Sequence, residues 1–494
     1  MISLSMNIVV TPVLALTPED RARAGELLLT LLDDYERGLP TAPLVPEFDE
    51  EALTDLLSAP ISREGIGVEG VFAEIKNKII PNSTALASPR FLAYVSGPPN
   101  GIAPYAEAIA AAINQNCNFW QLGPAASVVE RAVLRWLAEL VGYPPDAGGI
   151  LTGGGSIATL NALVTALNAF DPDFRANGLQ ARSAPAVVYT STEAHRSVDK
   201  AAAILGIGLD HVRHIPVDEQ HRMRVDALAE AIAADRRAGL APFCVVATSG
   251  TVTTGSVDPL NAIADLCERE ELWLHVDGAY GALFRLGTTT RDRLDGIERA
   301  DSITLDPHKM LFASLEAGCL LVRDRKRLRD AFAFNSSYLT IAEHPVMVDF
   351  MDYGPQLSRG FKALKVWTAL QAFGTDAFRA AVDQTLELAQ HLAERVRRAE
   401  ELELMAPVPL TAVCIRLRGA TDTDHTEILA QLAREGTALL GPANVNGRMG
   451  IRACVTNYRT RREDIDLVVD RLCEFARSVE SGRQGRSRQQ LAGS

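Results

Sequence analysis

Lys309 is the residue of this sequence with the clearest capacity for covalent chemistry. It ends residues 302–309 (SITLDPHK), in which a short apolar strand stops at Pro307 and is followed by His308 and Lys309. A lysine amine that is taken out of water gives up its proton more readily and can form an imine with an aldehyde. Most lysines are solvated surface charges, so this interpretation depends on what else the chain places nearby.

An acid follows a second apolar stretch. Residues 272–276 (LWLHV) lead directly into Asp277 and then into Gly278-Ala279-Tyr280. Open α/β sheets bind ligands at the carboxyl ends of their strands, so Asp277 and Lys309 are expected at the same edge. Pyridoxal 5′-phosphate (PLP) needs these two groups, because the lysine holds its aldehyde and the acid keeps its pyridine nitrogen protonated.

These two stretches, residues 275–280 (HVDGAY) and 306–309 (DPHK), resemble the group II PLP-dependent amino-acid decarboxylases, which include aromatic-amino-acid and glutamate decarboxylases. The resemblance covers roughly residues 85–470, with its motifs in the family's order. It implies fold type I, PLP as cofactor, and conversion of an L-amino acid to an amine and CO2 through a Lys309 aldimine and a quinonoid intermediate. It also implies a homodimer with the active site at the subunit interface.

The composition indicates a folded protein of more than one unit. The chain has 494 residues, more than a single hydrophobic core usually serves, with 47% hydrophobic and 22% charged residues. A formal charge of −13 disfavours nucleic acid or an anionic membrane as a partner, which leaves a small-molecule substrate as the expected ligand.

The cysteines and the N-terminus suggest a cytoplasmic protein. Seven cysteines are scattered without CxxC spacing, which predicts free buried thiols and no zinc or other metal site. The apolar run at residues 8–16 is interrupted by Pro12 and lacks the basic flank of a signal peptide. We found no apolar stretch near the roughly 20 residues that a membrane-spanning helix needs.

The apolar pattern predicts an α/β fold with a mainly parallel central sheet, helices on both of its faces and a small α+β domain. Residues 1–95 form a helical segment that in the related family packs on the partner subunit. The resemblance implies that residues 96–375 form the large PLP-binding domain and residues 376–480 the small C-terminal domain. The composition of residues 481–494 predicts a disordered tail.

Individual elements follow from the same pattern. Helices are expected from Pro18 to before Gly38 and at 68–78, 103–116, 128–141, 377–402 and 462–479. Strands are expected at 186–190, 243–248, 272–276, 302–305, 318–322, 411–417 and 450–455.

A glycine-rich turn joins a strand end to a helix start at residues 152–156 (TGGGS). Glycines let the backbone approach an anion, and the helix N-terminus adds free N–H groups and a positive dipole end. In the related family the phosphate contacts correspond to Gly155 and Ser156. A dinucleotide-binding turn fits less well, because the G-x-G-x-x-G spacing is absent and no acid follows at the expected distance.

The resemblance assigns further cofactor contacts. His195 corresponds to the histidine that stacks on the cofactor ring opposite Ala279, although a lone histidine is more often structural. Thr251 matches a residue beside the cofactor, but Val252 stands where relatives often have a second threonine. His308 is a further expected contact.

Tyr338 and Arg452 are the expected functional residues outside the cofactor motifs. Tyr338 lies 29 positions after Lys309 (338 minus 309), where aromatic decarboxylases carry a mobile-loop tyrosine that can protonate Cα. Arg452 matches the glutamate-decarboxylase arginine that meets the substrate carboxylate. The alternatives are a surface tyrosine and a salt bridge between domains.

The sequence does not identify the amino acid that is the substrate. Phe91, Phe119 and Trp120 can line a pocket for an aromatic or bulky side chain, or can be core residues. Aspartate, glutamate and diamino acids are handled on the same fold. The alternative functions are an aldehyde-forming oxidative deaminase, a carbon–carbon lyase, an aminotransferase or a non-catalytic relative.

Asp306 is where the chain differs from many relatives, which have asparagine at this position. A carboxylate here would repel the cofactor phosphate unless it is turned away or paired with a cation.

Overall fold

The centre of the computed structural model, which describes residues 14–61, 63–334 and 347–492, is a seven-stranded sheet with the order β1-β7-β6-β5-β4-β2-β3. Strand β7 runs antiparallel to β1 and β6, and the remaining strands are parallel to one another. The expected mainly parallel sheet is confirmed. Its strands are β1 (Gly148–Thr152), β2 (Ala186–Ser191), β3 (Val212–Ile215), β4 (Ala241–Thr248), β5 (Trp273–Asp277), β6 (Ser302–Leu305) and β7 (Gly318–Val322).

The central strands were predictable because they are mostly apolar and buried along their length. Strand β4, for example, is buried at all but its first residue, as in strands covered on both faces. Strand β3 was not predicted. It is short, lies at the edge of the sheet and carries Arg213 and His214 in its middle, so its sequence lacks an apolar run.

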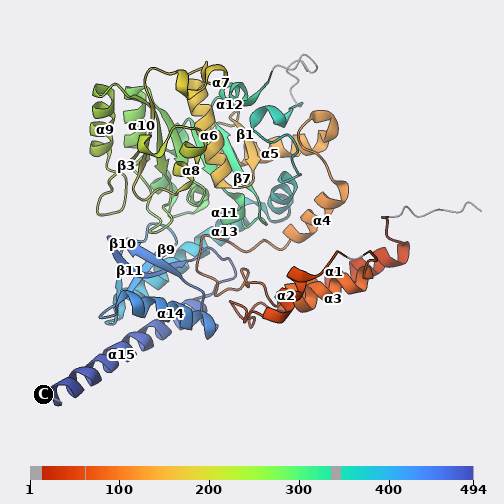
Figure 1. Ribbon diagram of the computed structural model, residues 1–494, viewed down its shortest axis with the longest axis vertical. Helices are drawn as coiled ribbons and strands as arrows, with labels where there is room; N and C mark the ends of the chain where they lie inside the picture. The colour runs from red at the N-terminus through yellow and green to blue at the C-terminus, as the bar shows by residue number, and fades with distance from the viewer. Residues whose placement is uncertain (1–13, 62, 335–346, 493–494) are drawn as a thin grey trace, which may run out of the picture.

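Helices pack around this sheet in the upper part of Figure 1. Helix α6 contacts β6 and β7 as well as α8 and α12, and α5 contacts β1. The helices of this region are α4 (Ala103–Ile113), α5 (Pro124–Leu140), α6 (Gly155–Phe170), α7 (Phe174–Asn177), α8 (Ser197–Ile204), α9 (Val225–Arg237), α10 (Leu260–Glu270), α11 (Pro307–Met310) and α12 (Arg325–Phe332).

A second, antiparallel sheet with its own hydrophobic core follows in the chain. Its order is β10-β11-β9-β8, and helices α13, α14 and α15 pack against it. These elements are α13 (Ala363–Arg398), β8 (Leu402–Leu404), β9 (Ala412–Leu417), α14 (Asp422–Arg434), β10 (Gly441–Val445), β11 (Arg448–Cys454) and α15 (Arg462–Ala492).

Two helices of this region differ from the expectation. Helix α13 begins before residue 377 because two helical parts join at Gly374, whose φ of 70° is readily adopted only by glycine. Helix α15 continues through Ala492, beyond the expected end at residue 479. No proline interrupts this tail, and its arginines and glutamines are good helix formers.

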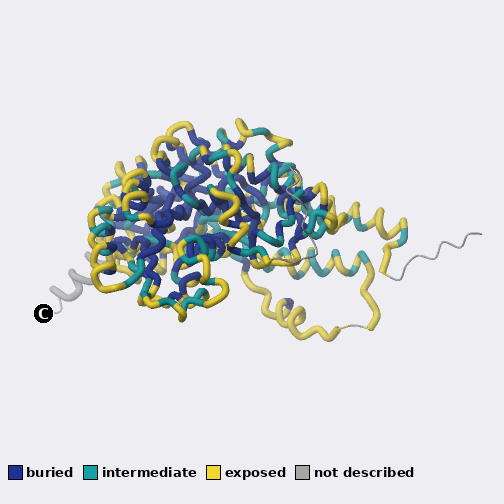
Figure 2. The backbone as a smooth tube through the Cα atoms, turned by 90° about the horizontal axis from the view of Figure 1, so that it is seen from above, coloured by how far each residue is buried: buried dark blue, intermediate teal, exposed yellow. Residues whose placement is uncertain are grey.

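The N-terminal helices stand apart from the main body. They are α1 (Pro18–Gly38), α2 (Glu50–Ser58), α3 (Gly67–Glu74) and the π-helix Ile75–Ile79. Thr17 caps α1 by accepting the Asp20 N–H at 3.1 Å, as its sequence predicts. Helices α1 and α3 bury no residue and α2 buries only Ala52. Figure 2 shows helices that project from the main body and are largely exposed. Their apolar side chains are therefore largely uncovered within this chain.

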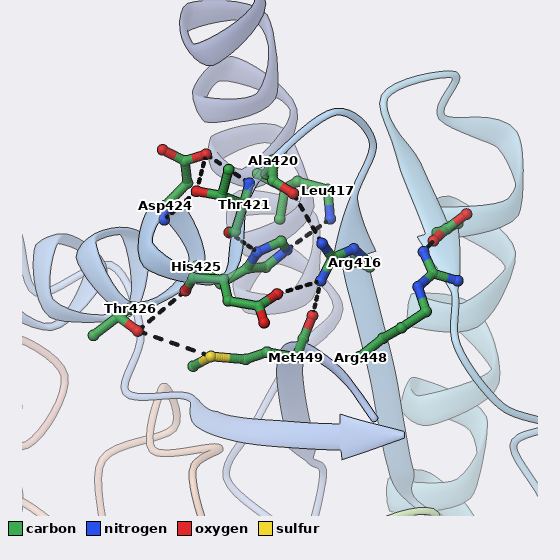
Figure 3. Close-up of polar contacts among 11 residues, drawn as sticks. Arg416, Leu417, Ala420, Thr421, Asp424, His425, Thr426, Arg448 and Met449 are labelled. Carbon is green, nitrogen blue, oxygen red and sulfur yellow. Dashed lines mark hydrogen bonds and ion pairs between the residues drawn. The ribbon is translucent and has the colours of Figure 1, made fainter. Parts of the chain in front are cut away.

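His425 connects α14 to β9 in the second sheet (Figure 3). Its Nδ1–H donates to the Thr421 carbonyl at 2.7 Å, and its Nε2 accepts the Leu417 N–H at 3.1 Å. The ring is buried, and burial lowers its pKa below the ordinary 6.5. The neutral form is required here, because a proton on Nε2 would face the Leu417 donor.

We therefore predict acid sensitivity from His425. The folded-state pKa is lower than the unfolded-state value, so the unfolded chain binds more protons and stability falls as pH drops below about 6.5. His425→Gln can still accept from Leu417 but does not titrate. Urea unfolding at pH 7.5 and pH 5 should show that the wild-type protein loses more stability than His425→Gln, by at most about 2 kcal/mol. Equal losses in the two proteins would contradict this role.

Candidate active site

A cavity of about 290 Å³ lies at the carboxyl ends of β1, β4, β5 and β6. These parallel strands bring Asp277 and Lys309 to the same edge, as expected from their positions after apolar stretches. The lining residues are Gly153, Gly154, Gly155, Ser156, Ile157, His195, Ser197, Thr248, Gly250, Val252, Asp277, Ala279, Tyr280, Asp306, His308, Lys309 and Leu315.

Lys309 lies on the short helix α11, directly after β6, and is paired with Asp306. Its Nζ is 3.0 Å from Asp306 Oδ2, and His308 Nε2 is 3.7 Å from the same oxygen. Asp306 is only 1% exposed, and its Oδ1 has no hydrogen-bond partner among the described residues. The acid is therefore paired with a cation rather than turned away.

Asp277 ends β5 and is buried at the floor of the cavity. Burial raises the pKa of its carboxyl, and the positive charge of Lys309 together with the Ala279 N–H opposes that rise. Its Oδ1 accepts this N–H at 3.1 Å. A buried carboxyl with raised proton affinity is suited to share a proton with a ring nitrogen.

His275 supports the same strand from within the sheet. Its Nδ1 lies 2.8 Å from Ser302 Oγ and its Nε2 lies 3.2 Å from Thr304 Oγ1, both on β6. Complete burial lowers the pKa of His275 to about 3, so the ring is neutral at ordinary pH. These contacts tie the strand that ends in Asp277 to the strand that leads to Lys309.

The glycine-rich turn leaves its backbone open to the cavity. Gly154 has a φ of 135°, and a Cβ on Gly155 would lie 3.0 Å from the Ala279 Cβ and 3.1 Å from Asp306 Oδ2. Helix α6 starts at Gly155 and Ser156, so its free N–H groups face this space. The turn, Lys309 and Asp277 fit a cofactor with a phosphate, an aldehyde and a basic ring nitrogen.

The two histidines expected to contact the cofactor, His195 and His308, both line the cavity. The Ser197 N–H donates to His195 Nδ1 at 3.2 Å, and Ser197 Oγ lies 2.9 Å from the same nitrogen. His308 Nδ1 lies 2.7 Å from the Ala317 carbonyl, and burial lowers the pKa of His308. Both rings are held by local contacts in fixed orientations.

Thr251 and Arg452 do not line the cavity. The Thr251 hydroxyl lies 2.9 Å from Thr254 Oγ1 and accepts the Ser256 N–H at 3.0 Å, so it closes its own turn. The Arg452 guanidinium donates to the Val252 carbonyl at 2.6 Å and to the Ala93 carbonyl at 3.3 Å. It therefore braces the chain and is not directed at the cavity within this chain.

The three aromatic candidates also lie outside the cavity lining. Phe91 is buried, while Phe119 and Trp120 are half-buried. The Trp120 N–H donates to Asp349 Oδ1 at 2.7 Å. Tyr338 lies outside the described residues.

The apolar lining residues Ile157, Val252 and Leu315 were missed as site residues. The sequence contains many apolar residues in similar settings, so it offers no signal that distinguishes these three.

Comparison with known proteins identifies the family. The conserved pattern described as "Pyridoxal-dependent decarboxylase conserved domain" matches residues 51–418. The chain belongs to the pyridoxal-dependent decarboxylase family. It is 34% identical to an aromatic-L-amino-acid decarboxylase of Bacillus atrophaeus, over 94% of this chain and 97% of that protein. It is also 34% identical to an L-2,4-diaminobutyrate decarboxylase of Rhizobium meliloti (strain 1021), over 85% of each chain.

Solved structures agree with this assignment. The crystal structure of mouse CSAD in apo form has a TM-score of 0.87 and 29% identity, over 93% of this chain and 99% of that one. Oryza sativa TDC with PLP and tryptamine has the same TM-score and 28% identity, over 94% and 99%. The fold is thus fold type I, and the protein is a PLP-dependent carboxy-lyase that acts on an amino acid. In the part of the chain described, no helix is long and apolar enough to cross a membrane.

We predict that Lys309 carries the cofactor. Borohydride reduction of the PLP-treated protein should fix the cofactor covalently on the peptide that contains Lys309, because an imine becomes a stable amine. Lys309→Ala should lose this label and the visible absorbance band. Lys326→Ala, which removes an exposed lysine from α12, is the matched control and should keep both. A band that survives in Lys309→Ala would refute the assignment.

Proposed function

We propose that this decarboxylase acts on an L-amino acid with an aromatic or other bulky apolar side chain. The observation that carries the proposal is the apolar character of the cavity wall, formed by Ile157, Val252, Tyr280 and Leu315. Leu315 is 63% exposed and lies at the wall without being buried in the core. An apolar substrate side chain would cover this surface and gain free energy from leaving water.

An acidic substrate is less well accommodated. Among the described lining residues, Lys309 is the only lysine or arginine, and it is committed to Asp306 and to the cofactor. Arg452 already donates to the carbonyls of Val252 and Ala93. The similarity to an aromatic-amino-acid decarboxylase over nearly the whole of both chains is consistent with this proposal.

Different residues around the cavity would hold different parts of the cofactor. When bound, PLP supplies an aldehyde that joins the substrate amine and a ring that takes up the electron pair left by CO2. Gly155 and Ser156 would hold the phosphate through the N-terminus of α6. Asp277 would keep a proton at the ring nitrogen, and His195 would lie flat against the ring on the face opposite Ala279.

Lys309 and Asp306 would act together when the lysine leaves the cofactor. The Asp306 carboxylate, 3.0 Å from Nζ, would hold the lysine in position while it is not joined to the cofactor. His308 would contact the cofactor from the same turn. Tyr338 is proposed as the acid that protonates Cα after CO2 has left.

We also propose a cytoplasmic homodimer. Leu29 and Tyr35 on α1 are exposed, and a second copy of the chain would cover these helices. The N-terminal segment of residues 1–95 would then pack on the partner, and the active site would lie at the interface. All seven cysteines are unpaired and buried, which is consistent with a reducing compartment.

The substrate proposal is tested by release of CO2 from a panel of amino acids. L-Tryptophan, L-tyrosine and L-phenylalanine should exceed L-glutamate, L-aspartate and L-2,4-diaminobutyrate in kcat/KM by about 100-fold or more, because a charged side chain pays desolvation at an apolar wall. Leu315→Ala should raise KM for the aromatic substrate. Leu357→Ala, which removes a similarly exposed leucine outside the cavity lining, should leave KM unchanged. Preference for an acidic substrate would overturn the proposal.

Tyr338→Phe tests the proton donor. Loss of a positioned acid should lower kcat for amine formation by about 10² or more, with cofactor binding unchanged. Amine and CO2 are measured against aldehyde and ammonia, which separates simple decarboxylation from aldehyde-forming chemistry. An unchanged kcat would remove Tyr338 from the mechanism.

A further inference from the structure

A second cavity, of about 340 Å³, lies at the other end of β1. It includes Gly148 and Gly149, where the strand begins, whereas Gly153 to Gly155 at the cofactor cavity follow its last residue. The two linings share no residue, and the five-residue strand between them is about 16 Å long. This cavity is therefore separate from the cofactor site.

Three arginines from two elements line the second cavity. Arg131 and Arg135 lie one turn apart on α5, and Arg325 is the first residue of α12. Asp146 is the only acidic residue among the described lining residues. The chain as a whole carries a formal charge of −13, whereas the lining of this cavity contains three arginines and one aspartate.

Arg325 is held in place by its surroundings. Its Nε donates to the hydroxyl of the buried Tyr353 at 3.0 Å, and its guanidinium lies 6.0 Å from the centre of that ring. A Cβ on Gly148 would come within 2.7 Å of the Arg325 Cα, so the start of α12 packs directly against β1. These contacts hold the Arg325 side chain at the cavity wall, where its other guanidinium N–H groups can donate to a ligand.

The cations also act on one another. Burial and the nearby charge of Arg325 lower the pKa of Arg131, whose side chain is half-buried. Guanidinium groups bind oxyanions through paired N–H donors.

We propose that this cavity binds a small oxyanion with two or more negative charges, such as a phosphate compound or a polycarboxylate. Its charged end would meet Arg131, Arg135 and Arg325. An apolar part would rest against Leu134 and Phe350, which also line the cavity. The volume lies at the lower end of the range for small-molecule sites. This site goes beyond the proposed decarboxylation and does not depend on its substrate.

The test uses the cofactor-loaded full chain, so that the phosphate-binding turn at Gly155 is already filled. Isothermal titration calorimetry with sodium pyrophosphate, at ionic strength held constant with sodium chloride, should show one site. Arg325→Gln and Arg131→Gln should each weaken the affinity about tenfold or more, as expected for loss of a charge-assisted hydrogen bond. Arg327→Gln removes an exposed arginine of the same helix, outside the cavity lining, and should bind like the wild-type protein.

A parallel titration with citrate distinguishes a phosphate ligand from a polycarboxylate ligand. Tighter binding of pyrophosphate assigns a phosphate ligand, and tighter binding of citrate assigns a polycarboxylate. The cofactor absorbance and circular dichroism of each variant report whether it is folded, and Arg325→Lys, which keeps the charge, should bind between wild type and Arg325→Gln. Absence of binding by both anions, or equal binding by Arg325→Gln, Arg327→Gln and wild type, would overturn the proposal.

Discussion

The contact between Asp306 and Lys309 constrains the rest of the active site. A carboxylate that is 1% exposed is tolerated only with a cation close by, and Nζ lies 3.0 Å from Oδ2. Lys309 lies on the single turn of α11 that follows β6, three residues after Asp306. A side chain at Gly155 would crowd this acid, because its Cβ would lie 3.1 Å from Oδ2.

A buried ion pair fixes the strand that carries the glycine-rich turn. Glu130 Oε1 accepts from Arg359 at 2.5 Å and from the Leu151 N–H at 3.0 Å, while Arg359 donates to the Leu151 carbonyl at 2.9 Å and to the Cys117 carbonyl at 2.8 Å. Both backbone groups of Leu151 are thus held two residues before Gly153. Such a pair specifies geometry more than it adds stability, because its desolvation cost offsets its attraction. It joins α5, β1 and the chain that precedes α13.

The sequence predicts which residues follow the ends of strands, because that depends only on their order along the chain. It does not predict the direction in which a side chain points. Asp277 and Lys309 could be placed at one edge because each follows an apolar strand of a parallel sheet. Arg452 could not be placed, because β11 is buried along most of its length and its pattern does not reveal which face an arginine occupies. Thr251 lies beside Val252, yet only Val252 lines the cavity, because the tight turn directs the threonine hydroxyl to Thr254. Strand β3 was missed since its middle is polar.

The position of Arg452 bears directly on substrate choice. Its guanidinium joins β11 of the second sheet to the Val252 carbonyl and to the Ala93 carbonyl, so that packing in the second sheet sets the position of a cavity wall. To bind a substrate carboxylate the guanidinium would have to give up these carbonyls, and Ala93 is buried. A buried acceptor left without a donor costs about 1–3 kcal/mol. The same bonds that hold Val252 at the wall therefore keep the Arg452 guanidinium from turning toward the cavity within this chain.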